Sequence, residues 1–263
     1  MAEHSDRVAL IPGGAGGIGS AVATAFAREG AQVVVADLDE GRAGEVAGGL
    51  DGGPHSSLAV DVADPSSVAA AVRHAVDQHG RVDYLAYCAG NNVKAPSLEL
   101  SLEEWTSALD SHLTGAFLFS QAVARQLIAQ GEGGRIVYVS SVGAWAPIPQ
   151  RGAYSPSKAA LNSLAGMLSI EWAEHDILTN TVCPGVAETA MTTLVYERDP
   201  QLRDTRRKRM PIKREVRPDE IADLIVFLCS PRASYINGVA IPIDGGFLNS
   251  GFMPEPGSPG GDA

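Results

Sequence analysis

The chain has 263 residues, of which 45% are hydrophobic, and it carries a formal net charge of −11. A chain of this size and composition can bury one sizeable core, so we expect a single compact domain. No apolar run is long enough to cross a bilayer, and the negative charge argues against a nucleic-acid surface, so neither a membrane nor a nucleic acid is an expected partner.

The N-terminal residues are polar and acidic and lack the apolar stretch of a secretion signal. The three cysteines, Cys88, Cys183 and Cys229, lie in apolar surroundings and do not have metal-ligand spacing. Buried free thiols are typical of a reducing compartment. We therefore expect a cytoplasmic protein without a metal site.

Strand-like apolar runs alternate with helix-like segments along most of the chain. Strands are predicted at residues 7–11, 32–36, 57–60, 82–88, 135–139, 178–182 and 239–243, and helices at residues 18–29, 65–79, 102–129, 154–174 and 218–229. Ser101 and Glu104 have the spacing of a capping box before the third helix. The alternation predicts an α/β fold of three layers, a Rossmann-type doubly wound parallel sheet of seven strands with helices on both faces.

The domain organisation follows from the same pattern. Residues 1–250 are interpreted as one domain that binds a dinucleotide and carries out the chemistry. The stretch at about 187–218 is long, charged and poorly periodic, so we expect a mobile lid there. Residues 254–263 are rich in Pro and Gly, which predicts a disordered tail.

A glycine-rich turn joins the first predicted strand to the first predicted helix. Gly13, Gly17 and Gly19 have the spacing G-x-x-x-G-x-G, with Ile18 between the last two. Glycines leave backbone N–H groups accessible at a helix N-terminus, where a pyrophosphate can approach. A strand before the turn and a helix after it favour a dinucleotide site over an ordinary tight connection.

Asp37 closes the second predicted strand and is followed by Leu38. A carboxylate at this position can accept hydrogen bonds from an adenosine ribose and would repel a 2′-phosphate. No Lys or Arg lies in the glycine turn or directly after Asp37. We therefore expect NAD as the cofactor, with NADP less favoured.

A second informative stretch joins the fifth predicted strand to the helix after it. Ser141 follows the strand, Tyr154 opens the helix, and Lys158 lies one helical turn further on. A phenol has a reference pKa of about 10, and a nearby ammonium together with a positive nicotinamide would favour the phenolate. Tyr154 could then take a proton from an alcohol as hydride leaves, while Ser141 bonds the substrate oxygen.

Together these stretches resemble a single-domain short-chain dehydrogenase/reductase, an NAD(P)-dependent alcohol dehydrogenase or ketoreductase. The resemblance runs from residue 7 to about residue 247. It is carried by the glycine turn, Asp61-Val62, Cys88-Ala89-Gly90, Ser141, Tyr154, Lys158, Pro184-Gly185, Thr189 and Asp244-Gly245-Gly246.

The resemblance also implies roles for residues outside the two stretches. Asp61 and Val62 would border the adenine, and Ala89 and Gly90 would run beneath the cofactor. Lys158 would additionally bind the nicotinamide ribose. The residues flanking the nicotinamide would be Pro184, Gly185, Val186 and Thr189. Family members are usually homotetramers that bury the helices at residues 102–129 and 154–174 between subunits.

Three residues depart from the family pattern. Pro12 replaces a threonine of the glycine turn, and Cys88, at the cofactor site, replaces an asparagine. His112 replaces an asparagine that holds a water in a proton path to the lysine. His112 either preserves this relay as a fourth catalytic residue or is a structural replacement. A working relay, kept neutral by Lys158, would add an acid limb to the pH profile.

A small alcohol or ketone is expected to bind above Ser141 and Tyr154. The predicted substrate residues are Asn91, Val93, Ser141, Trp145, Gln150, Tyr154 and Met191. The leading hypothesis is NAD-dependent interconversion of a secondary alcohol and a ketone. An NADPH-dependent 3-oxoacyl ketoreductase is an alternative that Asp37 disfavours. A catalytically silent nucleotide sensor is another, disfavoured by the intact Ser, Tyr and Lys.

Overall fold

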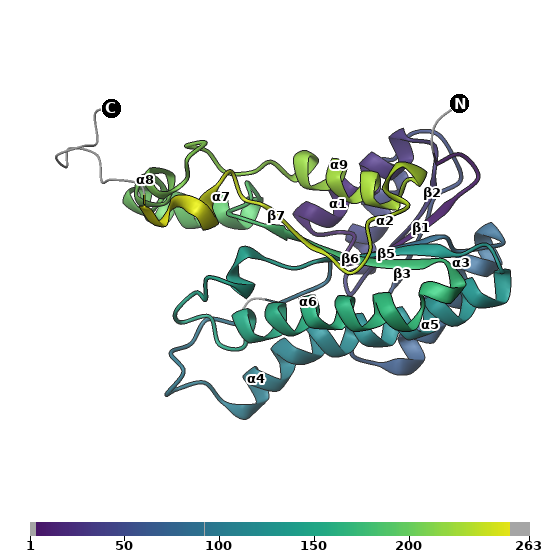
Figure 1. Ribbon diagram of the computed structural model, residues 1–263, viewed down its shortest axis with the longest axis horizontal. Coiled ribbons are helices and arrows are strands. Elements are labelled where there is room, and N and C mark those ends of the chain that lie inside the picture. The colour runs from purple at the N-terminus through teal and green to yellow at the C-terminus, as the bar shows by residue number, and fades with distance from the viewer. Residues whose placement is uncertain (1–3, 92, 253–263) are drawn as a thin grey trace.

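A computed structural model of the protein describes residues 4–91 and 93–252, so the tail predicted at 254–263 lies outside the described residues. Within them, seven parallel strands form one sheet in the order β3-β2-β1-β4-β5-β6-β7 (Figure 1). The strands are β1 (Val8–Pro12), β2 (Gln32–Asp37), β3 (Ser56–Ala59), β4 (Tyr84–Tyr87), β5 (Gly134–Val139), β6 (Ile177–Pro184) and β7 (Ala240–Ile243). The predicted fold class is confirmed.

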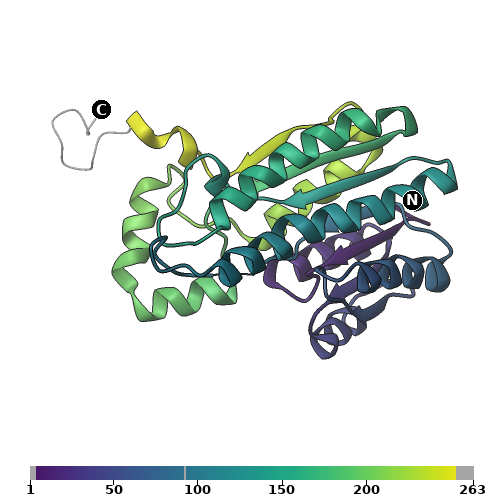
Figure 2. The ribbon, with the colours of Figure 1, turned by 90° about the horizontal axis from the view of Figure 1, so that it is seen from below.

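Helices cover both faces of the sheet, as expected. One face carries α1 (Gly17–Arg28), α2 (Glu40–Gly48) and α9 (Pro218–Cys229), and the other carries α3 (Pro65–His79), α5 (Gly115–Gln130) and α6 (Tyr154–Glu171). Helices α5 and α6 run alongside one another across the second face (Figure 2). In the described part of the chain, no helix has both the length and the apolar character needed to cross a membrane.

The segment predicted as one helix over residues 102–129 is interrupted. Helix α4 (Leu102–Leu109) passes through a π-helical turn, η1 (Asp110–Thr114), before α5 begins. The capping box of Ser101 and Glu104 is present at the start of α4, as predicted. The hydroxyl of Tyr87 donates to the carbonyl of Ser111 at 2.7 Å, inside the π turn. Apolar periodicity continues across such a turn, so it does not reveal the interruption.

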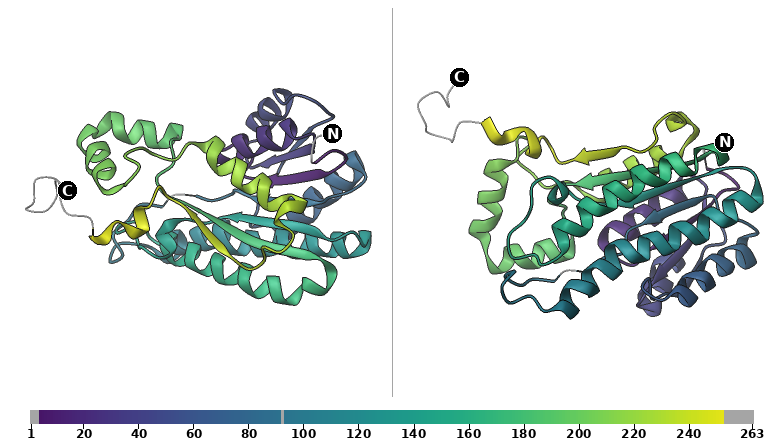
Figure 3. Two further views of the ribbon diagram at one scale, coloured as in Figure 1. Left: turned by 45° about the horizontal axis from the view of Figure 1, so that its top comes forward. Right: turned by 60° about the horizontal axis from the view of Figure 1, so that its bottom comes forward.

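Three helices are present where the apolar pattern predicts none. Helix α2 is short and buries only Ala43 and Ala47, so its apolar face is too narrow to stand out. Helices α7 (Ala190–Arg198) and α8 (Pro200–Arg209) occupy the region expected to form a lid and stand off the end of the sheet (Figure 3). Thr189 caps α7, and Asp199 caps α8. Capping residues, rather than periodicity, mark these helices in the sequence.

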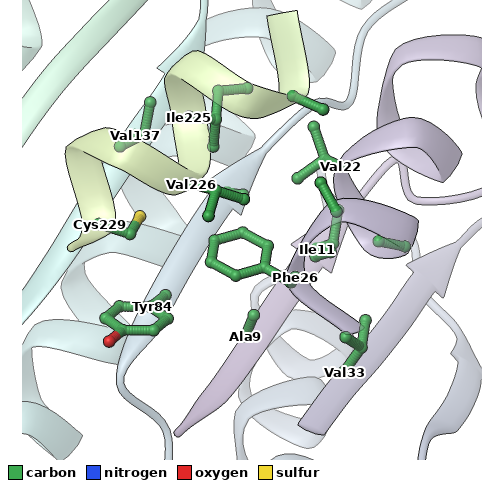
Figure 4. Packing of buried hydrophobic residues seen from close by; sticks show 14 of the residues in the cluster. Ala9, Ile11, Val22, Phe26, Val33, Tyr84, Val137, Ile225, Val226 and Cys229 are labelled. Carbon is green, nitrogen blue, oxygen red and sulfur yellow. The ribbon is translucent and has the colours of Figure 1, made fainter. Parts of the chain in front are cut away.

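Two apolar layers fill the space between the sheet and its helices. In the layer under α1 and α9, Phe26 lies between Val226 and Ala9 (Figure 4). The rings of Phe26 and Tyr84 are stacked with their centroids 5.6 Å apart. Full burial of a side chain of this size contributes about 1.5–3 kcal/mol to the free energy of folding. The layers therefore hold the ends of the central strands in fixed positions.

His79 ends α3 and joins it to two strands. Its Nδ1 lies 2.7 Å from Oε1 of Gln32, and its Nε2 lies 2.8 Å from Oγ of Ser56. An amide oxygen only accepts, so Nδ1 carries the hydrogen and Nε2 accepts from Ser56 in a neutral ring. Burial lowers the pKa of His79, and the charges of His74 and His55 lower it further.

We predict that His79 makes the protein less stable in mild acid. The unfolded chain binds the proton with a pKa of about 6.5 and the folded chain with a lower one, so stability present above pH 6.5 is lost as the pH falls below it. Urea unfolding at about pH 7.5 and 5.5 should show a smaller loss for His79→Gln than for the native protein. His175→Gln, at a half-exposed histidine, is the control and should behave as the native protein does. An equal loss in all three proteins would contradict the prediction.

Candidate active site

A cleft of about 940 Å³ opens where β1, β2, β3 and β4 end. Strand order reverses between β1 and β4, and such reversals are where doubly wound sheets bind ligands. The predicted cofactor residues that line the cleft are Gly13, Asp37, Leu38, Asp61, Val62, Cys88, Ala89 and Gly90. The fold therefore brings together most of the residues predicted to bind the adenosine part of the cofactor.

The glycine turn is shaped by close backbone packing. Gly13 has a φ of +77°, and a Cβ there would lie 2.5 Å from the backbone nitrogen of Ala89. Gly17 is the first residue of α1, Gly19 packs its Cα against the turn, and Ile18 joins the apolar layer. No side chain among the described residues caps the N-terminus of α1. Its first N–H groups can therefore bind an anion, which fits the pyrophosphate of a dinucleotide.

Asp37 sits on the rim of the cleft at the end of β2. Its Oδ2 accepts the backbone N–H of Ala15 at 3.0 Å, and its Oδ1 accepts that of Asp39 at 3.3 Å. Arg42 lines the same rim and donates from Nη2 to the carbonyl of Ala15 at 2.9 Å. Arg42 is not among the residues expected from the sequence, because only the folding of α2 brings it back to the glycine turn.

The residues predicted to flank the nicotinamide lie at the end of β6 and after it, and they too reach the glycine turn. Pro184 ends β6, Gly185 and Val186 follow it, and Thr189 caps α7. A Cβ on Gly17 would lie 3.3 Å from Cβ of Thr189, so the two segments are in contact. Both ends of the predicted cofactor site therefore adjoin the start of α1.

The structure brings Ser141, Tyr154 and Lys158 close to one another. Ser141 is buried, and its Oγ accepts the N–H of Gly143 at 3.0 Å in the short helical turn η2 (Val142–Ala144). The Ser141 hydroxyl is near enough to the Tyr154 phenol to lower its pKa. The Nζ of Lys158, also buried, donates to the carbonyl of Val139 at 2.8 Å and lies 5.9 Å from the centre of the Tyr154 ring.

Burial dominates the ionisation of these groups. It raises the pKa of Tyr154, and the hydrogen bond from Ser141 and the charge of Arg151 lower that pKa only in part. Burial lowers the pKa of Lys158 to about 8. The lowering of the phenol pKa expected from Lys158 is therefore not found, because desolvation of a phenolate outweighs it and the ammonium is directed at a carbonyl.

His112 lies in η1 and uses both ring nitrogens on the protein. Nε2 lies 2.9 Å from the carbonyl oxygen of Asn91, and Nδ1 lies 2.7 Å from Oγ of Ser157. A carbonyl only accepts, so Nε2 carries the hydrogen, and in a neutral ring Nδ1 accepts from Ser157. Its ring meets that of Tyr154 edge-on, with centroids 5.6 Å apart. A relay water on either nitrogen would have to displace one of these contacts.

Ser157 contacts both His112 and Tyr154, and the motifs alone do not single it out. Its Oγ lies 2.7 Å from Nδ1 of His112 and 2.7 Å from the carbonyl oxygen of Tyr154, so with a neutral histidine its single hydrogen is donated to one or the other of these two acceptors. Its spacing of three residues from Tyr154 is the available signal in the sequence, since residues three apart share a helical face. Through Ser157, the π turn is connected to the first turn of α6.

The residues predicted to contact the substrate are more dispersed than Ser141, Tyr154 and Lys158 are. Asn91 turns its side-chain amide toward Ser107 of α4, at 3.0 Å, and lines the cofactor cleft instead. Val93 faces Gly152 in the loop before α6, where Gln150 has a φ of +60°. Trp145 is half-exposed after η2. The side chain of Met191 lies outside the described part of the structure.

We predict that His112 does not titrate in the working range of the protein. Burial and then the Lys158 ammonium lower the pKa of His112 to about 3, so the ring is neutral well above that pH. Log(turnover) against pH should therefore superimpose for the native protein and His112→Asn between about pH 5 and 8, whatever the difference in absolute rate. An acid limb near pH 6 in the native protein alone would contradict this and support a histidine relay.

Comparison with known proteins gives consistent matches over nearly the whole chain. A family model described as enoyl-(acyl carrier protein) reductase matches residues 13–248. The chain is 39% identical over 243 residues to D-threitol dehydrogenase of Mycolicibacterium smegmatis, covering 92% of each protein. It is 32% identical to NAD-dependent glycerol dehydrogenase of Listeria innocua, covering 92% of this chain and 94% of that protein. The crystal structure of acetoin dehydrogenase from Enterobacter cloacae superimposes with a TM-score of 0.84 at 31% identity, covering 95% of this chain and 99% of that one.

Proposed function

The chain belongs to the short-chain dehydrogenase/reductase family of oxidoreductases, and on this premise we propose that it interconverts a secondary alcohol and a ketone with NAD as the cofactor. The observation that carries the proposal is the meeting of Ser141, Tyr154 and Lys158 in a buried site that adjoins the dinucleotide cleft. Dehydrogenase names among the relatives support the same reaction class.

Each group in the site has a chemical role in this proposal. Bound NAD supplies the hydride acceptor. Ser141 holds the substrate oxygen, and Tyr154 exchanges the hydroxyl proton as general base or acid. Lys158 binds ribose hydroxyls and holds its ammonium 5.9 Å from the centre of the Tyr154 ring. His112 positions the first turn of α6, which carries Tyr154 and Lys158, through Ser157, whose Oγ lies 2.7 Å from both the histidine Nδ1 and the Tyr154 carbonyl oxygen.

For the substrate we propose a small polyol or hydroxyketone. Two relatives are named for threitol and glycerol, and a similar solved structure is named for acetoin. Ser141, and Gln150 in the loop before α6, offer polar contacts suited to such molecules. A panel of short polyols and hydroxyketones, read by NADH absorbance, tests the assignment. A clear preference for long apolar or carrier-bound ketones would favour the alternative ketoreductase.

We also propose a cytoplasmic homotetramer. Helices α5 and α6 expose the large apolar side chains of Phe117, Ile128, Met167 and Ile170. Such side chains on neighbouring helices support burial between subunits. The three cysteines are free, which suits a reducing compartment.

Removing the hydroxyl of Tyr154 should strongly reduce turnover and leave cofactor binding intact. Tyr154→Phe should lose at least about 100-fold in turnover, the lower end for general acid–base catalysis, while NAD binding stays near normal. Tyr235→Phe, at a fully exposed tyrosine, is the matched control. Steady-state rates and NADH fluorescence titration measure the two effects. Near-normal turnover by Tyr154→Phe would show that the proton is carried by another group.

The native protein should bind NAD(H) more tightly than NADP(H). The carboxylate of Asp37 can accept from a ribose 2′-hydroxyl, whereas a 2′-phosphate brings negative charge without that donor. Asp37→Ala should narrow the difference in dissociation constant between the two cofactors. Fluorescence titration of each reduced cofactor measures it. Equal or tighter NADP(H) binding by the native protein would rule out the NAD assignment.

A further inference from the structure

The segment that leads from α8 to α9 carries a buried carboxylate. Glu215 is only 3% exposed, and α8 presents two guanidinium groups to it. Arg207 donates from Nη2 and Nε to Oε2 at 2.7 and 3.1 Å, and from Nε to Oε1 at 3.3 Å. The Nε of Arg203, one helical turn earlier, lies 3.9 Å from Oε1. These ion pairs therefore attach α8 to the chain that follows it.

The charge on Glu215 makes this attachment specific to one position of α8. Burial by itself would raise the pKa of Glu215, but the hydrogen bonds from Arg207 outweigh it and hold that pKa below its ordinary value. A buried carboxylate that loses its partner is left uncompensated, which is costly. Helix α8 is therefore strongly favoured where Arg207 reaches the carboxylate.

Helix α7 is held by the same group of charges. The ring of Tyr196 is buried, and the Cζ atoms of Arg203 and Arg206 lie 5.7 and 5.6 Å from its centre. Both distances are within the range over which a guanidinium is attracted to an aromatic ring. Helices α7 and α8 therefore form one unit that is attached at Glu215.

Glu215 is also next to the backbone contacts that hold the segment after β6. The N–H of Val216 donates to the carbonyl of Val186 at 3.0 Å, and the N–H of Glu188 donates to the carbonyl of Val216 at 2.8 Å. Val186 and Thr189 are among the residues expected to flank the nicotinamide, and Thr189 caps α7. This segment is therefore held on one side by the backbone of Val216 and on the other by α7.

We propose that Glu215 is a positioning residue for the nicotinamide half of the cofactor, which it serves by anchoring α8 through Arg207 and so fixing residues 186–189. The inference rests on the proposed binding of NAD, in which these residues flank the nicotinamide. The residues that line the cleft for the adenosine half follow β1, β2, β3 and β4 or belong to α4 and η1. The anchor should therefore affect one half of the cofactor and not the other.

Calorimetric binding of NADH and of ADP-ribose, without any turnover, tests the proposal. ADP-ribose has the adenosine, the pyrophosphate and a second ribose, but it lacks the nicotinamide. Arg207→Gln should weaken NADH about tenfold, which corresponds to about 1.4 kcal/mol, and change ADP-ribose less than about threefold. Arg207→Lys, which keeps the charge but loses the paired donors, should restore part of the loss.

Two further variants separate the anchor from other effects. Lys208→Gln removes the same charge from the next, exposed residue of α8 and should leave both affinities unchanged. Arg207→Gln leaves the buried carboxylate without its closest partner, so the double variant with Glu215→Gln, which removes that charge too, is measured beside it and should show the same selective loss. Retained binding of ADP-ribose shows that each variant is folded.

The outcomes also distinguish this inference from the proposed function. If the native protein does not bind NADH, the dinucleotide site itself is wrong and both proposals fall. If it binds both ligands, but the Arg207 and Glu215 variants leave NADH unaffected or weaken the two ligands equally, Glu215 does not position the nicotinamide half. In that case the proposed NAD-dependent function stands and only the role of the anchor is overturned.

Discussion

The reversal of strand order between β1 and β4 is the constraint on which the rest of the site depends. Parallel strands place their carboxyl ends at one edge of the sheet, and at the reversal the helices on either side cross opposite faces and leave a crevice. Loops that follow four different strands therefore line one cleft. The two apolar layers fix these strand ends, so the geometry of the cleft is a consequence of core packing.

The π turn η1 provides a second connection, between the segment after β4 and the first turn of α6. Two glycines make room for it. A Cβ on Gly90 would lie 2.8 Å from the His112 ring, and a Cβ on Gly115 would lie 2.5 Å from the Tyr87 hydroxyl oxygen. The imidazole of His112 thus fits because Gly90, in the segment after β4, has no side chain. His112 then bonds both the exit of β4 and the start of α6.

Burial moves the pKa values of Tyr154 and Lys158 apart, although their reference values of 10.0 and 10.5 are close. Desolvation opposes any charged form, so it raises the pKa of Tyr154 and lowers that of Lys158 to about 8. The buried ammonium of Lys158 donates a hydrogen bond to the carbonyl of Val139. The chain as a whole carries a net charge of −11. Because each pKa unit corresponds to about 1.4 kcal/mol, the phenol holds its proton more firmly, and the ammonium releases its proton more readily, than their reference values imply.

The sequence by itself determined the fold class, the glycine turn and the spacing of Ser141, Tyr154 and Lys158. These are short-range signals, because apolar periodicity and local motifs reflect backbone preferences within one or two elements. It did not reveal η1, since the apolar face continues through the turn. Helices α2, α7 and α8 were also missed, because capping residues rather than periodicity mark them.

Only the tertiary structure decided which groups face each other. The contact of Arg42 with Ala15 spans 27 residues, and that of His112 with Ser157 spans 45. Their existence depends on how α2 and η1 pack, which no local pattern records. The direction in which the pKa of Tyr154 shifts was also decided there, because desolvation depends on everything packed around the phenol rather than on the lysine one helical turn away.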